Sequence, residues 1–403
     1  MNVLVINAGS SSFKYQLLDL TAQNVLCSGL VERIGEPMGR MVHKIAPDSE
    51  AEEKLTTDRP FQNHVEGMKA VVAMITDPEK GVIKSKDEIN AIGHRVVMGG
   101  EAIKESVIVD QKVKDIIREC FALSPLHNPA NLAGIEVAEK LFPGVPNVAV
   151  FDTEFHATMP REAFMYPLPY EVYEKHRVRR YGFHGTSHRY VTRTAAEFLG
   201  KPLDQVNLVT CHLGNGCSIT AVRGGKSVDT SMGATPLDGL MMGTRCGEID
   251  PALVPFLMEK EGISAKEADT LMNKKSGLKG ICGVSDMRDI HAAVEKGDDR
   301  AKLALDMFVY RIVKTIGAYI AVLGHVDGIV FTAGIGENDN ITRALICKKL
   351  SEAFGVTLDE KANDVRSGAV RAISTDESRI PILVVPTNEE LEIAMTTMRL
   401  VAK

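Results

Sequence analysis

The sequence predicts an α/β protein built from two halves of similar organisation. With 403 residues we expect two to three domains, and 44% apolar with 25% charged residues excludes a disordered or collagen-like chain. Each half opens with an apolar strand, a turn of small residues and a returning strand, and segments of helical periodicity follow. The two halves therefore repeat a structural pattern, although their letters show no obvious repeat.

The first half begins with a predicted hairpin. Val3–Ile6 has the continuous apolar pattern of a buried strand, residues 7–11 form a turn, and residues 13–18 form the returning strand. The same patterns predict further strands at 25–33, 40–45, 91–93 and 148–151, and helices at 65–75, 111–121 and 129–141.

The second half follows the same order. Its predicted elements are strands at 206–211, 218–222 and 328–331, a turn at 214–216, and a long helix at 300–323. We place the domain boundary just after Asp152 and expect the last helix, 388–401, to return to the first domain. The predicted domains are residues 1–152 with 387–403, and residues 153–386.

Charge and cysteine content indicate the class of protein. Subtracting 53 acidic from 47 basic residues gives a net charge of −6, which argues against a nucleic-acid-binding or membrane-surface protein. The seven cysteines are scattered and form no C-x-x-C pair, so we expect reduced thiols and a cytoplasmic protein. The first residues lack a basic segment, and no apolar run approaches about 20 residues, so we expect neither a signal peptide nor a membrane span.

Three Gly-rich segments are candidates for binding phosphate or nucleotide. Residues 7–14 and 212–218 each place small residues between two strands, where consecutive backbone N–H groups suit phosphate oxygens. Either segment alone could be an ordinary hairpin turn. Two such turns at equivalent positions of the two halves are much less easily explained by coincidence. The third, Gly334–Asn338, lacks the third glycine of a dinucleotide fingerprint because position 339 is Asp, so we predict a backbone corner that receives the uncharged part of a nucleotide.

Several charged residues lie in Gly-rich or Pro-rich surroundings, and each is explained equally well by the polarity of loops. They are His94, Arg95, Asp152, His184 and Arg245. His184 and His188 have the spacing of a zinc pair, but no third ligand is evident. We expect instead that Thr186 or Ser187 caps a helix that begins near His188.

Taken together, these segments resemble the acetokinase family, within the superfamily of acetate and sugar kinases, Hsc70 and actin. The resemblance runs nearly end to end. It rests on NAGSSSFKYQLLD, GHRVVMGGE, LHNPANL, FDTEFHATMP, RRYGFHGTSHRYV, HLGNGCSIT, DTSMGATPLDGLMMGTRCGEIDP, SDMRD, FTAGIGEN and PTNEELEIA.

The resemblance implies two domains of duplicated ribonuclease-H-like topology with an active-site cleft between them. It implies a homodimer whose second domain binds nucleotide and dimerises. It also implies reversible phosphoryl transfer from ATP to acetate, giving ADP and acetyl phosphate on a route to acetyl-CoA, with Mg²⁺ or Mn²⁺ as the metal.

The resemblance also assigns site residues by position. Arg95, Asp152, His184 and Arg245 match catalytic residues, with Arg95 also on the substrate, and Asn7 and Glu389 match metal ligands. The wall around the acetate methyl matches Val97, Leu126, Phe183 and Pro236. The ATP site matches Lys14, His212, Leu213, Gly214, Asn215, Gly216, Asp286, Met287, Arg288, Gly334, Ile335, Gly336, Glu337 and Asn338.

Elementary chemistry constrains the mechanism that this resemblance implies. A carboxylic acid is already ionised at pH 7, so the nucleophile needs no general base, and the difficulty is to bring one anion to another. Positively charged groups must neutralise the transferring phosphoryl group. We therefore expect Asp152 to orient an arginine or a metal-bound water; a proton-transfer role stays open but is chemically unnecessary. Two alternatives stay open: a kinase of propionate or another short carboxylate, and a binding protein that uses ATP as a conformational switch.

Overall fold

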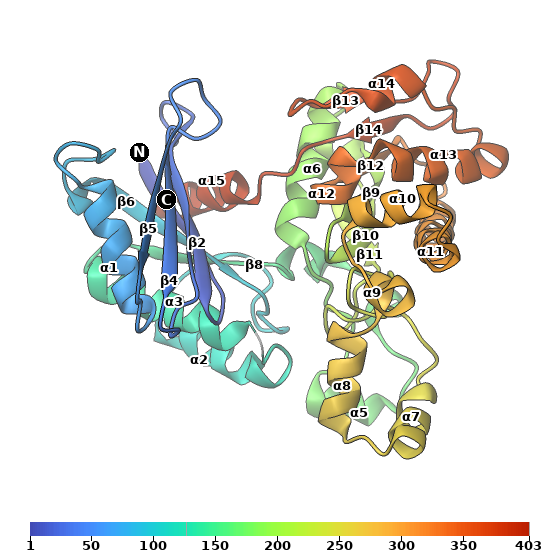
Figure 1. Cartoon of the computed structure of the whole chain (residues 1–403), viewed down its shortest axis with the longest axis horizontal. Helices are drawn as coiled ribbons and strands as arrows, with labels where there is room; N and C mark the ends of the chain where they lie inside the picture. The colour runs from blue at the N-terminus through green and yellow to red at the C-terminus, as the bar shows by residue number, and fades with distance from the viewer. Residues whose placement is uncertain (126, 403) are drawn as a thin grey trace. The chain divides into compact units, whose positions relative to one another are not determined.

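The computed structural model describes residues 1–125 and 127–402, and the chain divides into two compact units (Figure 1). Unit 1 comprises Met1–Glu154 and the segment from Asn388 onward, and unit 2 comprises Phe155–Thr387. Both units contain a β-sheet with helices, as the sequence predicted. The division after the eighth strand falls at Glu154, two residues beyond the expected position.

The sheet of unit 1 has eight strands in the order β5-β4-β3-β2-β1-β6-β8-β7. The strands are β1 (Asn2–Ala8), β2 (Ser12–Asp19), β3 (Asn24–Glu32), β4 (Gly39–Ile45), β5 (Glu53–Arg59), β6 (Ile89–Val96), β7 (Val107–Ile108) and β8 (Asn147–Phe151). The helices are α1 (His64–Ile75), η1 (Lys86–Glu88), α2 (Gln111–Glu119), η2 (Cys120–Ala122), α3 (Asn128–Leu141) and α15 (Glu389–Val401).

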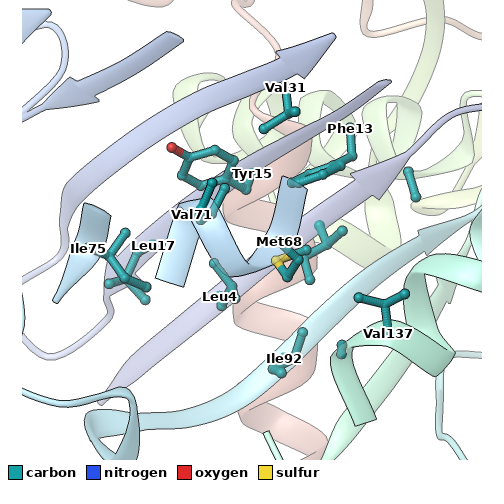
Figure 2. Close-up of a cluster of buried hydrophobic side chains, with 14 of the residues drawn as sticks. Leu4, Phe13, Tyr15, Leu17, Val31, Met68, Val71, Ile75, Ile92 and Val137 are labelled. Atoms are coloured by element: carbon teal, nitrogen blue, oxygen red, sulfur yellow. The ribbon is translucent and has the colours of Figure 1, made fainter. Parts of the chain in front are cut away.

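Both faces of this sheet are covered, because side chains alternate along β1. Leu4 and Ile6 belong to a core cluster with residues of α1 and α3, which Figure 2 shows around Met68, Val71 and Val137. Val3 and Val5 belong to a second cluster, which contains residues of α15. The C-terminal helix α15 thus packs on one face of the sheet of unit 1. Glu389, its first residue, therefore belongs to unit 1.

The sheet of unit 2 has six strands in the order β11-β10-β9-β12-β14-β13. The strands are β9 (Asn207–Leu213), β10 (Cys217–Arg223), β11 (Lys226–Thr230), β12 (Gly328–Thr332), β13 (Arg371–Ala372) and β14 (Ile382–Val384). The helices are η3 (Glu154–Thr158), α4 (Arg161–Phe164), α5 (Tyr170–His176), α6 (Gly185–Phe198), η4 (Leu203–Gln205), α7 (Leu253–Glu261), α8 (Ala265–Lys274), α9 (Gly277–Cys282), α10 (Met287–Glu295), α11 (Asp299–Leu323), α12 (Ala333–Asn338), α13 (Asn340–Phe354) and α14 (Glu360–Asp364).

Five strands of each sheet share one topology. The order β3-β2-β1-β6-β8 in unit 1 corresponds to β11-β10-β9-β12-β14 in unit 2. In unit 1, β1 pairs antiparallel with β2 and parallel with β6. In unit 2, β9 pairs in the same way, antiparallel with β10 and parallel with β12. This confirms the duplicated ribonuclease-H-like fold, and it places the turns after Ala8 and Leu213 at equivalent positions.

Three local expectations were wrong or incomplete. Strand β5 was missed because its residues are mostly polar and exposed, without an apolar face. Gly334–Asn338, predicted as a backbone corner that follows a buried strand, folds into the short helix α12 (Ala333–Asn338). Neither Thr186 nor Ser187 caps α6: His184 is the N-cap residue, with a left-handed φ of 57° and no capping side-chain hydrogen bond. In the described residues, no helix is both long and apolar enough to cross a membrane.

Candidate functional site

Unit 1 presents an ion pair at the carboxyl ends of two parallel strands. Arg95 lies near the end of β6 beside Val150, and Asp152 directly follows β8. Arg95 Nε donates to Asp152 Oδ1 at 2.9 Å, and Nη2 donates to Oδ2 at 2.7 Å. The Asp152 side chain is only 3% exposed, whereas that of Arg95 is 24% exposed. The two hydrogen bonds to Asp152 therefore fix the orientation of the guanidinium, while the Arg95 side chain stays partly exposed to solvent.

Glu389 adds a carboxyl group near this pair. The pKa of Glu389 is raised to about 7, mainly by burial and in smaller part by the charges of Asp152 and Glu390, while the charges of Arg95 and Lys14 oppose the rise. Asp152, for its part, raises the pKa of the Arg95 guanidinium, which stays charged. Three carboxyl groups, those of Asp152, Glu389 and Glu390, thus share the charges of Arg95 and Lys14, an arrangement that a further positive charge would relieve.

This local excess of carboxylate is the feature that fits a magnesium ion. Mg²⁺ takes oxygen ligands and commonly uses one or two carboxylates together with waters and substrate phosphates. With such an ion bound, Glu389 would offer a carboxylate, and Asn7, which pairs with Lys14 across β1 and β2, would offer an amide oxygen. Among the residues that the structure describes, no group of three or more His, Cys, Asp or Glu forms a complete protein cage for a metal.

Two asparagines that the sequence analysis did not assign hold the loops of unit 1. Asn131 Oδ1 accepts from the Val97 backbone N–H at 3.1 Å, and Asn131 Nδ2 donates to the Ala8 carbonyl at 2.7 Å. Asn128 bonds both the N–H and the carbonyl of Met98. These bonds join the loops after β1 and β6, so the asparagines of the LHNPANL segment position the loop beside Arg95. Leu126, predicted for the acetate wall, lies outside the described residues.

In unit 2 the side chains of His184 and Arg245 converge near Gly216. A Cβ placed on Gly216 would lie 3.4 Å from His184 Nε2 and 3.4 Å from Arg245 Nη2. Arg245 Nη1 donates to the Pro236 carbonyl at 2.7 Å, which fixes the direction of the guanidinium. Burial lowers the pKa of the Arg245 guanidinium below its ordinary value. Two cationic or hydrogen-donating groups thus face one turn whose glycine leaves room beside them.

His184 is held by a network of polar side chains. Its Nδ1 lies 2.9 Å from Ser218 Oγ, and its ring stacks on His212 with centroids 4.0 Å apart. His212 Nδ1 in turn lies 2.8 Å from Ser187 Oγ. The resemblance assigns His212 to the nucleotide site, and the structure shows its ring stacked on that of His184.

A cavity of about 700 Å³ opens beside the Gly-rich turn of unit 2. It is large enough for a nucleoside phosphate, since ligand cavities commonly measure about 300–1,000 Å³. Eight residues predicted for ATP line it: Gly214, Asn215, Asp286, Met287, Arg288, Gly334, Ile335 and Asn338. Six further residues line it that the sequence analysis missed: Ser285, His291, Asp339, Asn340, Ile341 and Arg366.

The other residues predicted for ATP do not line this cavity. Lys14 belongs to unit 1, and Leu213 and Gly336 are buried. Glu337 turns its carboxylate inward, where Oε1 accepts from the N–H groups of Ala333 and Thr387. Glu337 therefore braces the short helix α12. In the sequence, a carboxylate that binds backbone N–H groups cannot be distinguished from one that binds a ligand.

The chain is similar to known proteins over its whole length. The family model described as the Acetokinase family matches residues 2–395. An acetate kinase of Oleidesulfovibrio alaskensis is 68% identical over 398 residues, covering 99% of both chains. The crystal structure of Porphyromonas gingivalis acetate kinase matches with a TM-score of 0.94 at 46% identity, and that of a propionate kinase from Francisella tularensis with 0.92 at 41%, each covering 99% of both chains.

Proposed function

Because the chain belongs to the acetokinase family, we propose that it is an enzyme that transfers a phosphoryl group reversibly between ATP and acetate. The observation that carries this proposal is the convergence of His184 and Arg245 on Gly216, next to the cavity that Gly214 and Asn215 line. A nucleotide in this cavity would have its terminal phosphate near the two side chains. A binding protein that only switches with ATP has no use for this arrangement.

We assign the adenosine end of the nucleotide to the far part of the cavity. The backbone of Gly334 at the start of α12 leaves open space where a side chain would stand, which suits a flat base. Asp286 caps α10, and its carboxylate pairs with the guanidinium of Arg288, which lowers the Asp286 pKa to about 2.

For the acid substrate we assign Arg95 as the group that binds the carboxylate. Asp152 grips the guanidinium through Nε and Nη2, so the remaining N–H groups are presented in a fixed direction. Val97 in unit 1 stays a residue predicted for the wall around the methyl group, and in unit 2 the resemblance assigns Phe183 and Pro236 to the same role. Asp152 is ion-paired, which suits an orienting role better than proton transfer.

The chemical step needs no proton transfer. An oxygen of the acetate carboxylate attacks the terminal phosphorus of ATP, the bond from that phosphorus to the oxygen of ADP breaks, and ADP leaves with the electron pair. Arg95, His184 and Arg245 stabilise the negative charge of the transferring group. Mg²⁺, held by Asn7 and Glu389 and exchangeable for Mn²⁺, would neutralise phosphate charge when bound. Charges 4 Å apart at an effective dielectric constant near 20 interact by about 4 kcal/mol before desolvation.

The test is a hydroxamate assay for acyl phosphate with ATP, Mg²⁺ and formate, acetate, propionate or butyrate. We expect acetyl phosphate as the main product, with acetate giving the highest kcat/KM. Higher kcat/KM with propionate would favour the second candidate, which the likeness to a propionate kinase supports. Absence of acyl phosphate with every acid would overturn the assignment as a kinase.

We also propose a cytoplasmic homodimer formed through unit 2. Helices α7 and α11 carry large apolar side chains that are exposed in the single chain, namely Leu253, Phe256, Leu303 and Tyr310. All seven cysteines are free thiols, as expected for a reducing compartment. Sedimentation velocity of the protein tests the dimer, and a monomer at micromolar concentration would contradict it.

A further inference from the structure

We propose that Thr210, His188 and Ser218 form a hydrogen-bond chain with one direction, which keeps neutral His184 in its Nε2–H tautomer. His184 would then donate a proton from Nε2 to the transferring phosphoryl group without having to become an imidazolium. The three residues are positioning residues, because they act through His184. The inference rests on the proposed function, which gives His184 its role at the phosphoryl group.

The chain is continuous in the structure. Thr210 Oγ1 lies 2.7 Å from His188 Nδ1, His188 Nε2 lies 2.7 Å from Ser218 Oγ, and Ser218 Oγ lies 2.9 Å from His184 Nδ1. Thr210, His188 and Ser218 are fully buried. Three distances within the range of good hydrogen bonds therefore link a strand hydroxyl to the candidate catalytic imidazole.

Counting protons couples the tautomers of the two histidines. A serine hydroxyl has one proton, so Ser218, which lies between two imidazole nitrogens, donates to one and accepts from the other. His188 is neutral, because burial lowers its pKa well below 6.5 and the neighbouring His156 and His212 lower it further. It therefore has one N–H and one lone pair. With His184 also neutral, only two arrangements of the whole chain satisfy every bond.

Thr210 distinguishes these two arrangements. Across residues 1–125 and 127–402, its hydroxyl has no hydrogen-bond partner other than His188 Nδ1. If His188 donated from Nδ1, the Thr210 proton would be buried without an acceptor, which costs free energy. Thr210 therefore donates to His188 Nδ1, His188 donates from Nε2 to Ser218, and Ser218 donates to His184 Nδ1. His184 then carries its proton on Nε2.

The surroundings of His184 favour this neutral donor. The ring is faced by His212, which stacks on it, by Ser218 with His188 behind it, and by Arg245 near Gly216. His156 lies edge-on to His188 and donates from Nε2 to the Phe183 carbonyl. Arg245 already supplies positive charge beside Gly216, and a second cation would be repelled by it. A neutral N–H adds a hydrogen bond to an anion without that cost.

The direct test is NMR of protein labelled with ¹⁵N-histidine, at a pH above 8. His184→Gln identifies the signals of His184 among the eleven histidines. We expect Nδ1 without a proton and Nε2 with one. A proton on Nδ1 of neutral His184 would overturn the proposal. This readout does not depend on activity, whereas absence of acyl phosphate formation by the wild type would contradict the proposed function and leave the tautomer measurable.

The kinetic test compares Thr210→Val, Thr210→Ser and the wild type from pH 6 to 9. Thr210→Val removes the donor that sets the direction, so we expect kcat about tenfold lower at pH 8.5 and a smaller loss toward pH 6, because a protonated ring has both N–H groups whichever tautomer the neutral form adopts. Thr210→Ser keeps the hydroxyl and should restore the wild-type profile, and the KM for acetate should not change.

Thr220→Val is the matched control, since it removes a buried strand hydroxyl that bonds Thr230 and lies outside the chain of four residues. An equal loss of kcat for Thr210→Val at every pH would mean that Thr210 is merely structural, and would refute the proposal. If Thr210→Val does not fold, the NMR measurement on the wild type decides alone.

Discussion

The two units share one strand order but treat their arginines differently. In unit 1, Arg95 is neutralised by a bidentate carboxylate that is almost wholly buried. In unit 2, Arg245 bonds the Pro236 carbonyl and the Met242 sulfur, and the described residues provide no carboxylate for it. An arginine paired with a carboxylate has a fixed orientation, but the carboxylate offsets its attraction for an anion. An arginine without such a partner keeps the full attraction. We therefore expect both arginines to stabilise the transferring group, with Arg95 held mainly in a fixed direction and Arg245 contributing the larger share of uncompensated positive charge.

The largest expected effect follows from the unpaired arginine. Arg245→Leu should lower kcat by about 10³-fold, as is typical of arginines that stabilise phosphoryl transfer. Its stability should change little, because no buried acid is left without a partner. Steady-state kinetics and thermal unfolding measure both quantities. A variant that folds and keeps more than about a tenth of the wild-type kcat would contradict the role of Arg245.

Replacing the paired arginine, Arg95, should lower the stability of the folded protein as well as its activity. Arg95→Leu leaves the Asp152 carboxylate buried without its partner, which should cost about 3–5 kcal/mol of unfolding free energy in addition to lost activity. Arg40→Leu is the control, since Arg40 and Asp58 are both about half exposed and such a pair contributes about 0–1 kcal/mol. Urea unfolding compares the variants. Equal losses for both would show that the Arg95 pair is not a buried one.

Acid should destabilise the protein through a histidine of unit 1. His94 lies 2% exposed with Nε2 donating to Asn147 Oδ1, and burial lowers its pKa from 6.5 to about 4. The unfolded chain therefore takes up a proton as the pH falls below 6.5, while the folded protein resists until about pH 4. Stability from this group is complete above pH 6.5 and is lost between these values, by on the order of 3 kcal/mol.

His94→Gln should weaken this dependence. The variant is expected to be less stable at pH 7, yet to lose less stability than the wild type between pH 6.5 and 4. Urea midpoints measured at both pH values provide the comparison. Parallel losses in the two proteins would show that His94 is not the group that titrates.

The sequence predicted helices and strands well where apolar periodicity determines the structure. It predicted them poorly where contacts between residues distant in sequence determine it. The duplicated hairpins, the long helix α11 and the last helix follow from apolar spacing, since burial on one face imposes it. Strand β5 has no buried face, so it leaves no such pattern. The predicted cap of α6 was wrong because the helix begins at Gly185, before Thr186 and Ser187. The Ser187 hydroxyl instead bonds His212 and Thr387, two residues far away in the sequence.

The candidate site shows the same division. Residue types and motifs pointed to Arg95, Asp152, His184 and Arg245, but only coordinates reveal which of these are paired. The cavity residues His291 and Arg366 were missed because neither lies in a Gly-rich segment. Glu337 lies in one, and its carboxylate nevertheless binds backbone. Spacing identifies the loops that surround a ligand, whereas the direction of each side chain depends on packing.

The smallest expected effect concerns the choice of acid. Val97 directly follows β6, is 5% exposed, and has its N–H fixed by Asn131. Its branched side chain is stiff, so little room is left for another carbon beside the acetate methyl. One methylene group changes discrimination by about 1–3 kcal/mol. Val97→Ala should therefore raise kcat/KM for propionate relative to acetate by about tenfold, mostly through a lower KM for propionate.

A neighbouring valine provides the matched control for this prediction. Val96→Ala removes the same two methyl groups, but Val96 belongs to the core cluster with Ile135 and Phe151, so it should lower stability and leave the ratio of the two acids unchanged. The hydroxamate assay at several concentrations of each acid measures the ratio. An unchanged ratio in Val97→Ala would exclude Val97 from the acetate wall, and an equal change in Val96→Ala would trace selectivity to the packing of the strand end. Either result would leave the roles of Arg95 and Arg245 intact, because those depend on charge and not on the size of the acid.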